Sequence, residues 1–221
     1  MPRCLALILA LGLTPAQAQE PNLSSQSRVL PGVASQLVLA QRLFRKATGA
    51  GDPVLLLAAI RLARGVTLRP ALGWERTATD EVEPPAGDGP PDPASAAALA
   101  MLQGLAVDDP DLQDLVYDLD AQLPQGRLPV AMVAKSSLRA GAEEDWRMPL
   151  SGSVAAEIAV IGGTGNPLGI SVTDDSGAVV CARPATTDPA LCRFTPARNG
   201  FFGVRVSNAG AEGTGYLLLG N

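Results

Sequence analysis

NGFFGVRVSN, residues 199–208, alternates apolar and polar side chains. Phe202, Val204 and Val206 fall on one face of an extended chain, because successive side chains of a strand point to opposite faces. The pair Asn199-Gly200 in front of them is typical of a tight turn. This stretch therefore predicts a half-buried β-strand that starts at a turn.

The same alternation recurs through the last third of the chain. It is present at 155–161 and 168–172, and DDSG at 174–177 has turn chemistry. Period-two segments separated by turns about every ten residues are typical of an antiparallel sandwich. We therefore predict a β-sandwich domain over residues 146–221, with residues 124–145 as a linker or as its first strand.

Residues 35–123 carry helix-start signals instead. Asp is a favoured N-cap, and Pro at the first helical position loses only an N–H that has no partner in the helix. Ser35, Asp52-Pro53, Asp92-Pro93 and Asp109-Pro110 are predicted to begin four helices. The predicted fold class is thus α+β with two domains, a helical hairpin bundle followed by a jelly-roll-like antiparallel β-sandwich.

The helix starts are regularly spaced. Ser35 to Asp52 spans 17 positions, as does Asp92 to Asp109. Each pair has about the size of a helical hairpin in a tetratricopeptide-type repeat, and the pattern weakly resembles one. The repeat's aromatic and glycine positions are mostly missing, so two ordinary αα-hairpins in one small bundle are the alternative.

A loop rich in Pro, Gly and acidic residues is predicted at about residues 69–91, between the two helix pairs. Such a composition buries too little apolar surface to offset the entropy of ordering it, so we predict a flexible, disordered loop. Trp74 stands out within it. It is predicted to pack on the helices or, alternatively, to anchor a partner protein.

The N-terminus has the layout of a secretory signal peptide. Arg3 precedes an apolar run at residues 4–13, and Ala16-Gln17-Ala18 offers a small-x-small cleavage site. Residues 1–18 are therefore predicted to be removed on export, and residues 19–34 to form a flexible N-terminal segment. We expect an exported protein, periplasmic or extracellular, without a membrane span.

Charge and cysteine count follow from that cleavage. Without residues 1–18 the chain has 16 basic and 22 acidic residues, a net charge of −6. This argues against nucleic acid and anionic membrane as partners, because both need clustered Lys and Arg. Cys181 and Cys192 remain, and in an oxidising compartment we predict that they form a disulfide.

Candidate catalytic and metal-binding residues are few. The sequence has no histidine, which removes Ser-His-Asp and Cys-His catalysis and histidine metal sites. Two cysteines alone leave zinc two ligands short. Asp174 and Asp175 are weak candidates for calcium at a sandwich edge, although a turn role is favoured. We therefore predict no catalytic residue, no cofactor, no metal site and no enzyme.

Several short motifs of residues 143–221 together resemble the bacterial pre-peptidase C-terminal domain. They are DW at 145–146, LSGS at 150–153, LGISVTDDSG at 168–177, FTP at 194–196, NGFFGVRVSN at 199–208 and GYLL at 215–218. The resemblance implies a jelly-roll β-sandwich that is not catalytic. It further implies a part in secretion, in holding a catalytic neighbour or in binding polymers. The family often has a tyrosine where this chain has Phe201-Phe202.

The functional hypothesis is a non-catalytic, exported adaptor that binds another envelope or secreted protein. Trp74 and Trp146 are its candidate partner contacts. The alternative is a carbohydrate-binding module, although aromatic residues make up only 4% of the chain. Sugar platforms usually need exposed Trp or Tyr rings, and Trp146, Tyr117 and Tyr216 are expected to be largely packed. Calcium and glycan lack a supporting motif. An exposed apolar patch near Trp146 and Phe201-Phe202 would indicate a protein partner, and a flat polar surface there would indicate a spacer.

Overall fold

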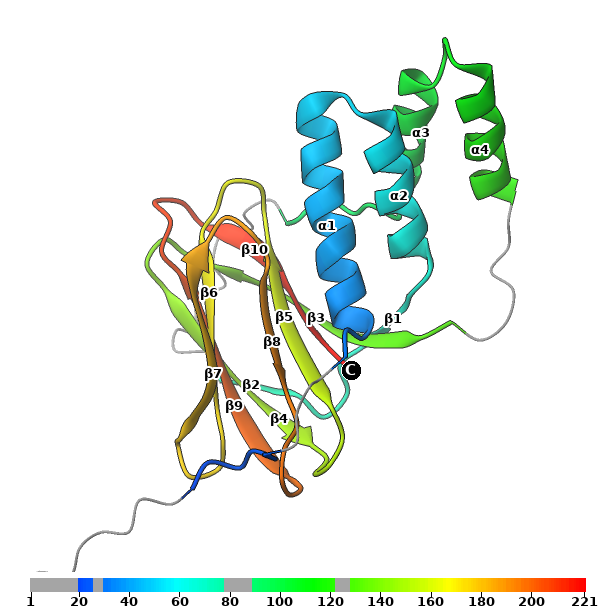
Figure 1. Ribbon diagram of the computed structural model, residues 1–221. Helices are drawn as coiled ribbons and strands as arrows, with labels where there is room; N and C mark the ends of the chain where they lie inside the picture. The colour runs from blue at the N-terminus through cyan, green and yellow to red at the C-terminus, as the bar shows by residue number, and fades with distance from the viewer. Residues whose placement is uncertain (1–19, 26–29, 78–88, 122–127) are drawn as a thin grey trace, which may run out of the picture.

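The computed structural model describes residues 20–25, 30–77, 89–121 and 128–221 (Figure 1). The predicted signal peptide, residues 1–18, lies outside the described residues. The described helices are α1 (Val33–Ala50), α2 (Pro53–Arg64), α3 (Ala96–Leu105) and α4 (Pro110–Ala121). The described strands are β1 (Thr67–Pro70), β2 (Glu75–Thr77), β3 (Val130–Leu138), β4 (Glu143–Leu150), β5 (Ala156–Gly162), β6 (Leu168–Thr173), β7 (Val179–Thr186), β8 (Ala190–Phe194), β9 (Gly200–Asn208) and β10 (Thr214–Gly220).

The strands form two five-stranded sheets. Sheet A has the order β1-β3-β10-β5-β8, and sheet B has the order β2-β4-β9-β6-β7. Strands β3 to β10 follow the two-sheet order of a jelly roll, and they pair antiparallel within each sheet. Strand β1 pairs parallel with β3 at the edge of sheet A. The predicted fold class, α+β with a C-terminal β-sandwich, is confirmed.

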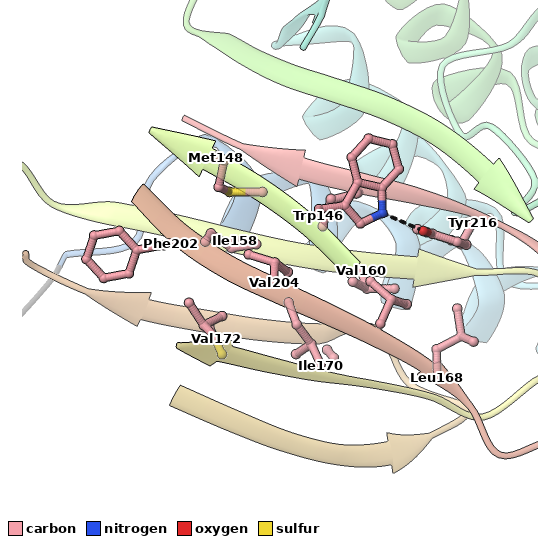
Figure 2. Close-up of a cluster of buried hydrophobic side chains, with 14 of the residues drawn as sticks. Trp146, Met148, Ile158, Val160, Leu168, Ile170, Val172, Phe202, Val204 and Tyr216 are labelled. Carbon is pink, nitrogen blue, oxygen red and sulfur yellow. Dashed lines mark hydrogen bonds between the residues drawn. The ribbon is translucent and has the colours of Figure 1, made fainter. Parts of the chain in front are cut away.

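The sandwich core contains the alternating residues that predicted its strands. Phe202, Val204 and Val206 on β9 are buried, and Figure 2 shows Phe202 and Val204 among the side chains between the sheets. Ile158 and Val160 on β5 face them from the opposite sheet. A buried Val, Ile or Phe side chain contributes about 1.5–3 kcal/mol, so this face supplies much of the stability of the sandwich.

Two of the four predicted helix starts are confirmed. Asp52 Oδ1 accepts hydrogen bonds from the backbone N–H groups of Val54 and Leu55, both at 3.0 Å. Asp109 Oδ1 accepts one from Leu112 N, also at 3.0 Å. The four helices share one apolar core, which includes Phe44 on α1, Ile60 on α2, Leu102 on α3 and Val116 on α4.

The other two starts were wrong by a few residues. Helix α3 begins at Ala96 with Ser95 as its N-cap, since Asp92 closes the preceding turn through Ala94 N. Helix α1 begins at Val33, so Ser35 lies within its first turn. In α3 the nearby hydroxyl of Ser95 accepts from Ala98 N and takes the N-cap position. In α1 no local side chain caps the helix, and its first N–H groups donate to Glu157, a residue distant in sequence.

Parts of the predicted loop and linker are strands. Strand β1 and strand β2 occupy Thr67–Pro70 and Glu75–Thr77, at the start of the loop predicted at residues 69–91. Strand β3 and the beginning of β4 fill most of the described part of residues 124–145. β1 and β2 gain hydrogen-bond partners from strands more than 60 positions away, which local composition cannot reveal. Residues 78–88 of the predicted loop lie outside the described residues.

The first described segment is tied to the sandwich. Asn22 is buried, and its backbone N–H donates to Asp174 Oδ2 at 2.6 Å. Leu23 packs against the sandwich core, and Ser24 N donates to the carbonyl of Thr195 at 2.8 Å. The prediction of a flexible segment at 19–34 was therefore wrong for these residues.

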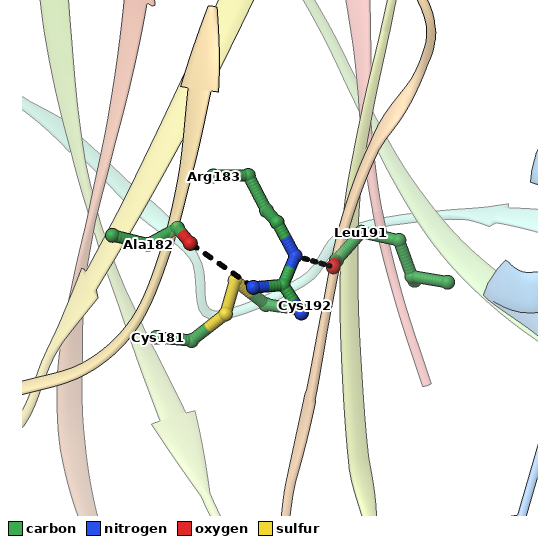
Figure 3. Close-up of a disulfide and its surroundings, with 5 residues drawn as sticks. All are labelled: Cys181, Ala182, Arg183, Leu191 and Cys192. Carbon is green, nitrogen blue, oxygen red and sulfur yellow. Dashed lines mark hydrogen bonds between the residues drawn. A yellow bond between two sulfur atoms is a disulfide. The ribbon is translucent and has the colours of Figure 1, made fainter.

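The disulfide between Cys181 and Cys192 is present, as predicted (Figure 3). Their Cα atoms are 5.9 Å apart. Cys181 lies on β7, the edge strand of sheet B, and Cys192 on β8, the edge strand of sheet A. The bond therefore joins the two sheets at one side of the sandwich.

Candidate binding sites

The two tryptophans, the predicted partner contacts, pack within the sandwich. Trp146 is buried, and its Nε1 donates to the hydroxyl of Tyr216 at 2.8 Å (Figure 2). Trp74 packs on the sandwich rather than on the helices: a Cβ added to Gly220 would lie 2.9 Å from its ring. Trp146 offers no free ring to a partner, and Trp74 is half-buried against the sandwich core.

A buried polar cluster surrounds Trp146. The carboxylate of Glu144 accepts hydrogen bonds from the Tyr216 hydroxyl and from Arg76 Nε, and it lies 3.2 Å from Trp146 Nε1. Burial, followed by the adjacent Glu144 carboxylate, raises the pKa of Tyr216. The cluster ties β2, β4 and β10 together. Each buried polar group in it has a partner, as structural networks require.

Asp174 performs the turn role that the sequence favoured. Its Oδ1 accepts hydrogen bonds from Ser176 N at 2.9 Å and from Ala178 N at 3.0 Å, and Oδ2 accepts one from Asn22. Burial alone would raise the pKa of Asp174, but these hydrogen bonds outweigh it and lower the pKa. Asp175 pairs with Arg198 at 3.1 Å. No group of three potential metal ligands occurs among the described residues.

The outer face of sheet B is polar. Arg205 forms a two-pronged contact with Asp145, at 2.7 and 2.9 Å. Phe201 is its exposed aromatic residue, and Arg147 covers the ring at 3.5 Å from the centroid. A shallow hollow of about 480 Å³ lies around Gly203. Val179 also lines this hollow and is exposed. The surface is therefore neither a contiguous apolar patch nor flat and fully polar, and it meets neither form of the criterion drawn from the sequence.

The outer face of sheet A is apolar and covered by α1. Along each strand, the side chains of this face alternate with the side chains that point into the core. The apolar residues on this face are Val133 on β3, Ala159 and Ile161 on β5, Leu191 on β8, and Leu217 and Leu219 on β10. Ala34 and Val38 of α1 pack on them. Because both faces of β5 are covered, every residue of that strand is buried.

Glu157 fixes the start of α1 on this face. Its side chain projects from β5, and only 2% of the residue is exposed. It accepts hydrogen bonds from Gly32 N at 2.8 Å, from Ser35 N at 2.9 Å and from the Ser35 hydroxyl. A carboxylate from the sheet thus satisfies the free N–H groups at the helix N-terminus, where negative charge is favourable.

The outermost pair of helices presents exposed apolar side chains. Helices α3 and α4 stand farthest from the sandwich in Figure 1. The exposed residues there are Met101, Leu105, Val107, Leu115 and Tyr117. A groove of about 500 Å³ runs between the helices, and its lining includes Tyr117, Val107, Asp114 and Asp120. Tyr117, 74% exposed, was predicted to be packed, and that prediction was wrong.

The residues at these two helix faces were not predicted as contact residues from the sequence. The signal for the α1 face was available, since Ala34, Val38 and Gln41 share one stripe at helical spacing. The signal for the exposed face was weaker. Leu112, Leu115, Val116 and Leu119 fit a helical stripe, but only Leu112 and Val116 are buried in α4.

Comparison with known proteins gives likenesses of low identity. No family model matches the chain, and no curated protein matches it in sequence. The chain is similar to the pre-peptidase C-terminal domain of collagenase from Bacillus anthracis, with 16% identity and a TM-score of 0.35 over 45% of this chain and 99% of that one. It is also similar to PliG, a periplasmic lysozyme inhibitor from Aeromonas hydrophila, with 14% identity and a TM-score of 0.30 over 46% of this chain and 91% of that one.

A third likeness is to TmCBM61, solved with β-1,4-galactotriose, with 14% identity and a TM-score of 0.28 over 41% of this chain and 81% of that one. None of these likenesses assigns a role to this chain, and the resemblance of residues 143–221 to the pre-peptidase C-terminal family stays a prediction. Among the described helices, none is both long and apolar enough to cross a membrane.

Proposed function

We propose that the protein is a non-catalytic, exported adaptor whose α3–α4 face binds a partner protein in the envelope or outside the cell. The observation that carries this proposal is the group of exposed apolar side chains on α3 and α4, at the end of the molecule farthest from the sandwich. Of these side chains, Val107 and Tyr117 line the α3–α4 groove. Apolar side chains exposed to water are costly and, where they gather at a groove, are typical of interaction sites.

Charge indicates the chemistry of the partner. Asp114 and Asp120 line the α3–α4 groove, and Asp108, Asp111 and Asp118 are exposed nearby. Among the described residues, only Arg64 forms an ion pair with this group, at 3.8 Å from Asp120. An apolar floor with an acidic rim favours a basic, amphipathic segment, because complementary charge steers association and fixes orientation.

The sandwich would then act as a rigid mount. The outer face of sheet B is polar, and its ion pairs satisfy one another: Arg205 with Asp145 and Glu143, and Arg147 with Glu75. The disulfide supports export, since such bonds persist in oxidising compartments. The predicted signal peptide supports the same compartment.

Site-specific photo-cross-linking in the producing cell tests the proposal. A photoreactive amino acid in place of Tyr117 should cross-link a discrete partner protein, whereas the same group in place of Phe201 should not. Asp114→Lys should reduce the Tyr117 cross-link at least about fivefold, because it reverses a rim charge. Glu212→Lys, an exposed charge reversal in the β9–β10 turn, is the matched control. Equal cross-linking at both positions, or none at Tyr117, would contradict the proposal.

The hollow around Gly203 on sheet B favours a glycan as the second candidate. Its lining includes Ser171, Thr173, Asp145 and Arg205, which are hydrogen-bonding groups suited to sugar hydroxyls. Against it, Arg147 already covers the nearby ring of Phe201. A glycan array separates the two cases. Binding that Arg205→Ala abolishes would favour the glycan, and a blank array would remove this candidate.

A further inference from the structure

A cavity lies at the junction of the helices with the sandwich. Its volume is about 190 Å³, and it is enclosed by α1, α2, the outer face of sheet A and residues 90–94. Most of its lining is apolar, including Leu37, Ala63, Ile161 and Leu219. The cavity is separate from the α3–α4 groove, so what it binds is independent of the proposed partner.

One buried polar group in this cavity has no partner. Gln41 lines it from α1 and is 3% exposed, and its Nε2 has no hydrogen-bond acceptor among the described residues. A buried donor without an acceptor is destabilising, and native proteins rarely retain one without a reason. A bound acceptor would supply that reason.

The second donor at the cavity is a lysine. Lys135 projects from the outer face of β3, opposite Leu217, and lines the cavity. No carboxylate of the described residues lies within ion-pair distance of it. Asp92 also lines the cavity, and its Oδ1 accepts from Ala94 N at 2.8 Å, which leaves the negative charge of the carboxylate in place. Lys135 is therefore needed to offset that charge for an anionic ligand. The donors without partners at this cavity are therefore an amide and an ammonium group.

We propose that this cavity binds a small apolar carboxylate. The hydrocarbon part would lie among the apolar side chains, the carboxylate would accept from Gln41 Nε2, and Lys135 would supply positive charge at the mouth. A cavity of about 150 Å³ holds the six heavy atoms of benzene, so this one has room for about eight. Hexanoate has that size and serves as the probe.

Titration calorimetry with a matched ligand series tests the chemistry. Hexanoate should bind about tenfold more tightly than butanoate, because two further methylene groups are buried. Hexylamine, which has the same chain and the opposite charge, should bind at least about tenfold more weakly than hexanoate. If hexanoate and hexylamine bind alike, or if neither binds at millimolar concentration, the proposal is wrong.

Variants separate a binding role of Gln41 from a structural one. Gln41→Leu should weaken hexanoate about tenfold, yet raise the melting temperature of the unliganded protein because a partnerless donor is removed. Lys135→Ala should weaken hexanoate severalfold and leave the melting temperature unchanged. Lys46→Ala, the other lysine of the chain and outside the cavity, is the control and should change neither.

The opposite pattern would overturn the assignment. If Gln41→Leu binds hexanoate like the wild type, the amide is not part of a site. If the same variant lowers the melting temperature, the amide serves the fold. Ala63→Leu provides an independent check, because it fills the cavity from α2 and should abolish hexanoate binding in a protein that still folds. Undiminished binding to Ala63→Leu would place hexanoate elsewhere.

Discussion

The outer faces of the two sheets carry opposite chemistry in one jelly roll. Sheet A presents Ala159, Ile161 and Leu219 outward and is covered by α1. Sheet B presents Asp145 and Arg205 outward and remains open. In both sheets the side chains that point into the core are apolar. Only the outward-pointing side chains therefore distinguish the covered sheet from the open one. The apolar outer face of sheet A therefore requires α1 to cover it, so α1 docks on this sheet as part of the folding of the chain.

A buried charge on the outer face of sheet A should lower the free energy of unfolding far more than the same charge on the outer face of sheet B. Ala159→Asp places a carboxylate between β5 and α1 without a partner, and we expect it to cost about 4 kcal/mol or more of the free energy of unfolding. Ser171→Asp on the open face of sheet B, opposite Arg205 in the register, should change it by less than about 0.5 kcal/mol. Urea denaturation measures both. Similar losses in the two variants would mean that the two faces do not differ in burial.

Removing the covalent link between the sheets should have the next largest effect. Cys181→Ser with Cys192→Ser should lower the free energy of unfolding by about 3 kcal/mol, because the unfolded chain regains the entropy of an open loop. The measurement is the denaturation midpoint with and without reductant. Reductant should destabilise the wild type and leave the double variant unchanged. A wild-type midpoint that does not respond to complete reduction would contradict this account.

The anchoring of α1 on sheet A can be tested at Glu157. Glu157→Ala leaves the N–H groups of Gly32 and Ser35 without their acceptor, and we expect a loss of about 2 kcal/mol. Glu157→Gln should lose less, since an amide oxygen can still accept. The control on sheet B is Glu143→Gln, an exposed residue whose change should stay below about 0.5 kcal/mol. An equal effect at Glu143 would show that the position of the carboxylate does not matter.

The smallest expected effect concerns acid stability at the β6–β7 turn. Hydrogen bonds lower the pKa of Asp174 below its usual 3.8. The contribution of its carboxylate to the free energy of unfolding is therefore present above pH 3.8 and is lost as the pH falls through the lowered pKa. Asp174→Asn should lose about 1–2 kcal/mol at neutral pH and show a flatter decline in acid. Asp175→Asn, in a surface pair, should retain the wild-type decline. Parallel acid profiles for wild type and Asp174→Asn would refute this role.

Local patterns predicted the parts of the fold that local chemistry controls. The alternation at Phe202 and Val204 identified β9, and Asp52-Pro53 and Asp109-Pro110 identified the starts of α2 and α4. The disulfide followed from cysteine count and compartment. The strand and the helix starts depend on side chains within a few residues of one another. The disulfide depends on two cysteines that have no third cysteine to compete with them once residues 1–18 are removed.

Features that depend on distant partners were not predictable in the same way. Strand β2 is three residues long and consists of Glu75, Arg76 and Thr77, and it exists because β4 offers it a hydrogen-bonding edge. Trp74 was assigned to the helices because they are its neighbours in sequence, whereas its ring lies against Gly220. Among the candidate sites, the cavity at Gln41 is lined by six separate segments of the chain, so no local pattern of one segment defines it.

The placement of β1 and β2 decides where this chain can be divided. One completes sheet A and the other completes sheet B, and both precede α3 and α4 in the chain. A cut at residue 143, where the family resemblance begins, would therefore remove β1, β2 and β3 and uncover an edge of each sheet. Exposed edges invite pairing with other chains. Helices α3 and α4 lie in the chain between strands β2 and β3 of the sandwich. A fragment of residues 143–221 should therefore aggregate instead of serving as a transferable module.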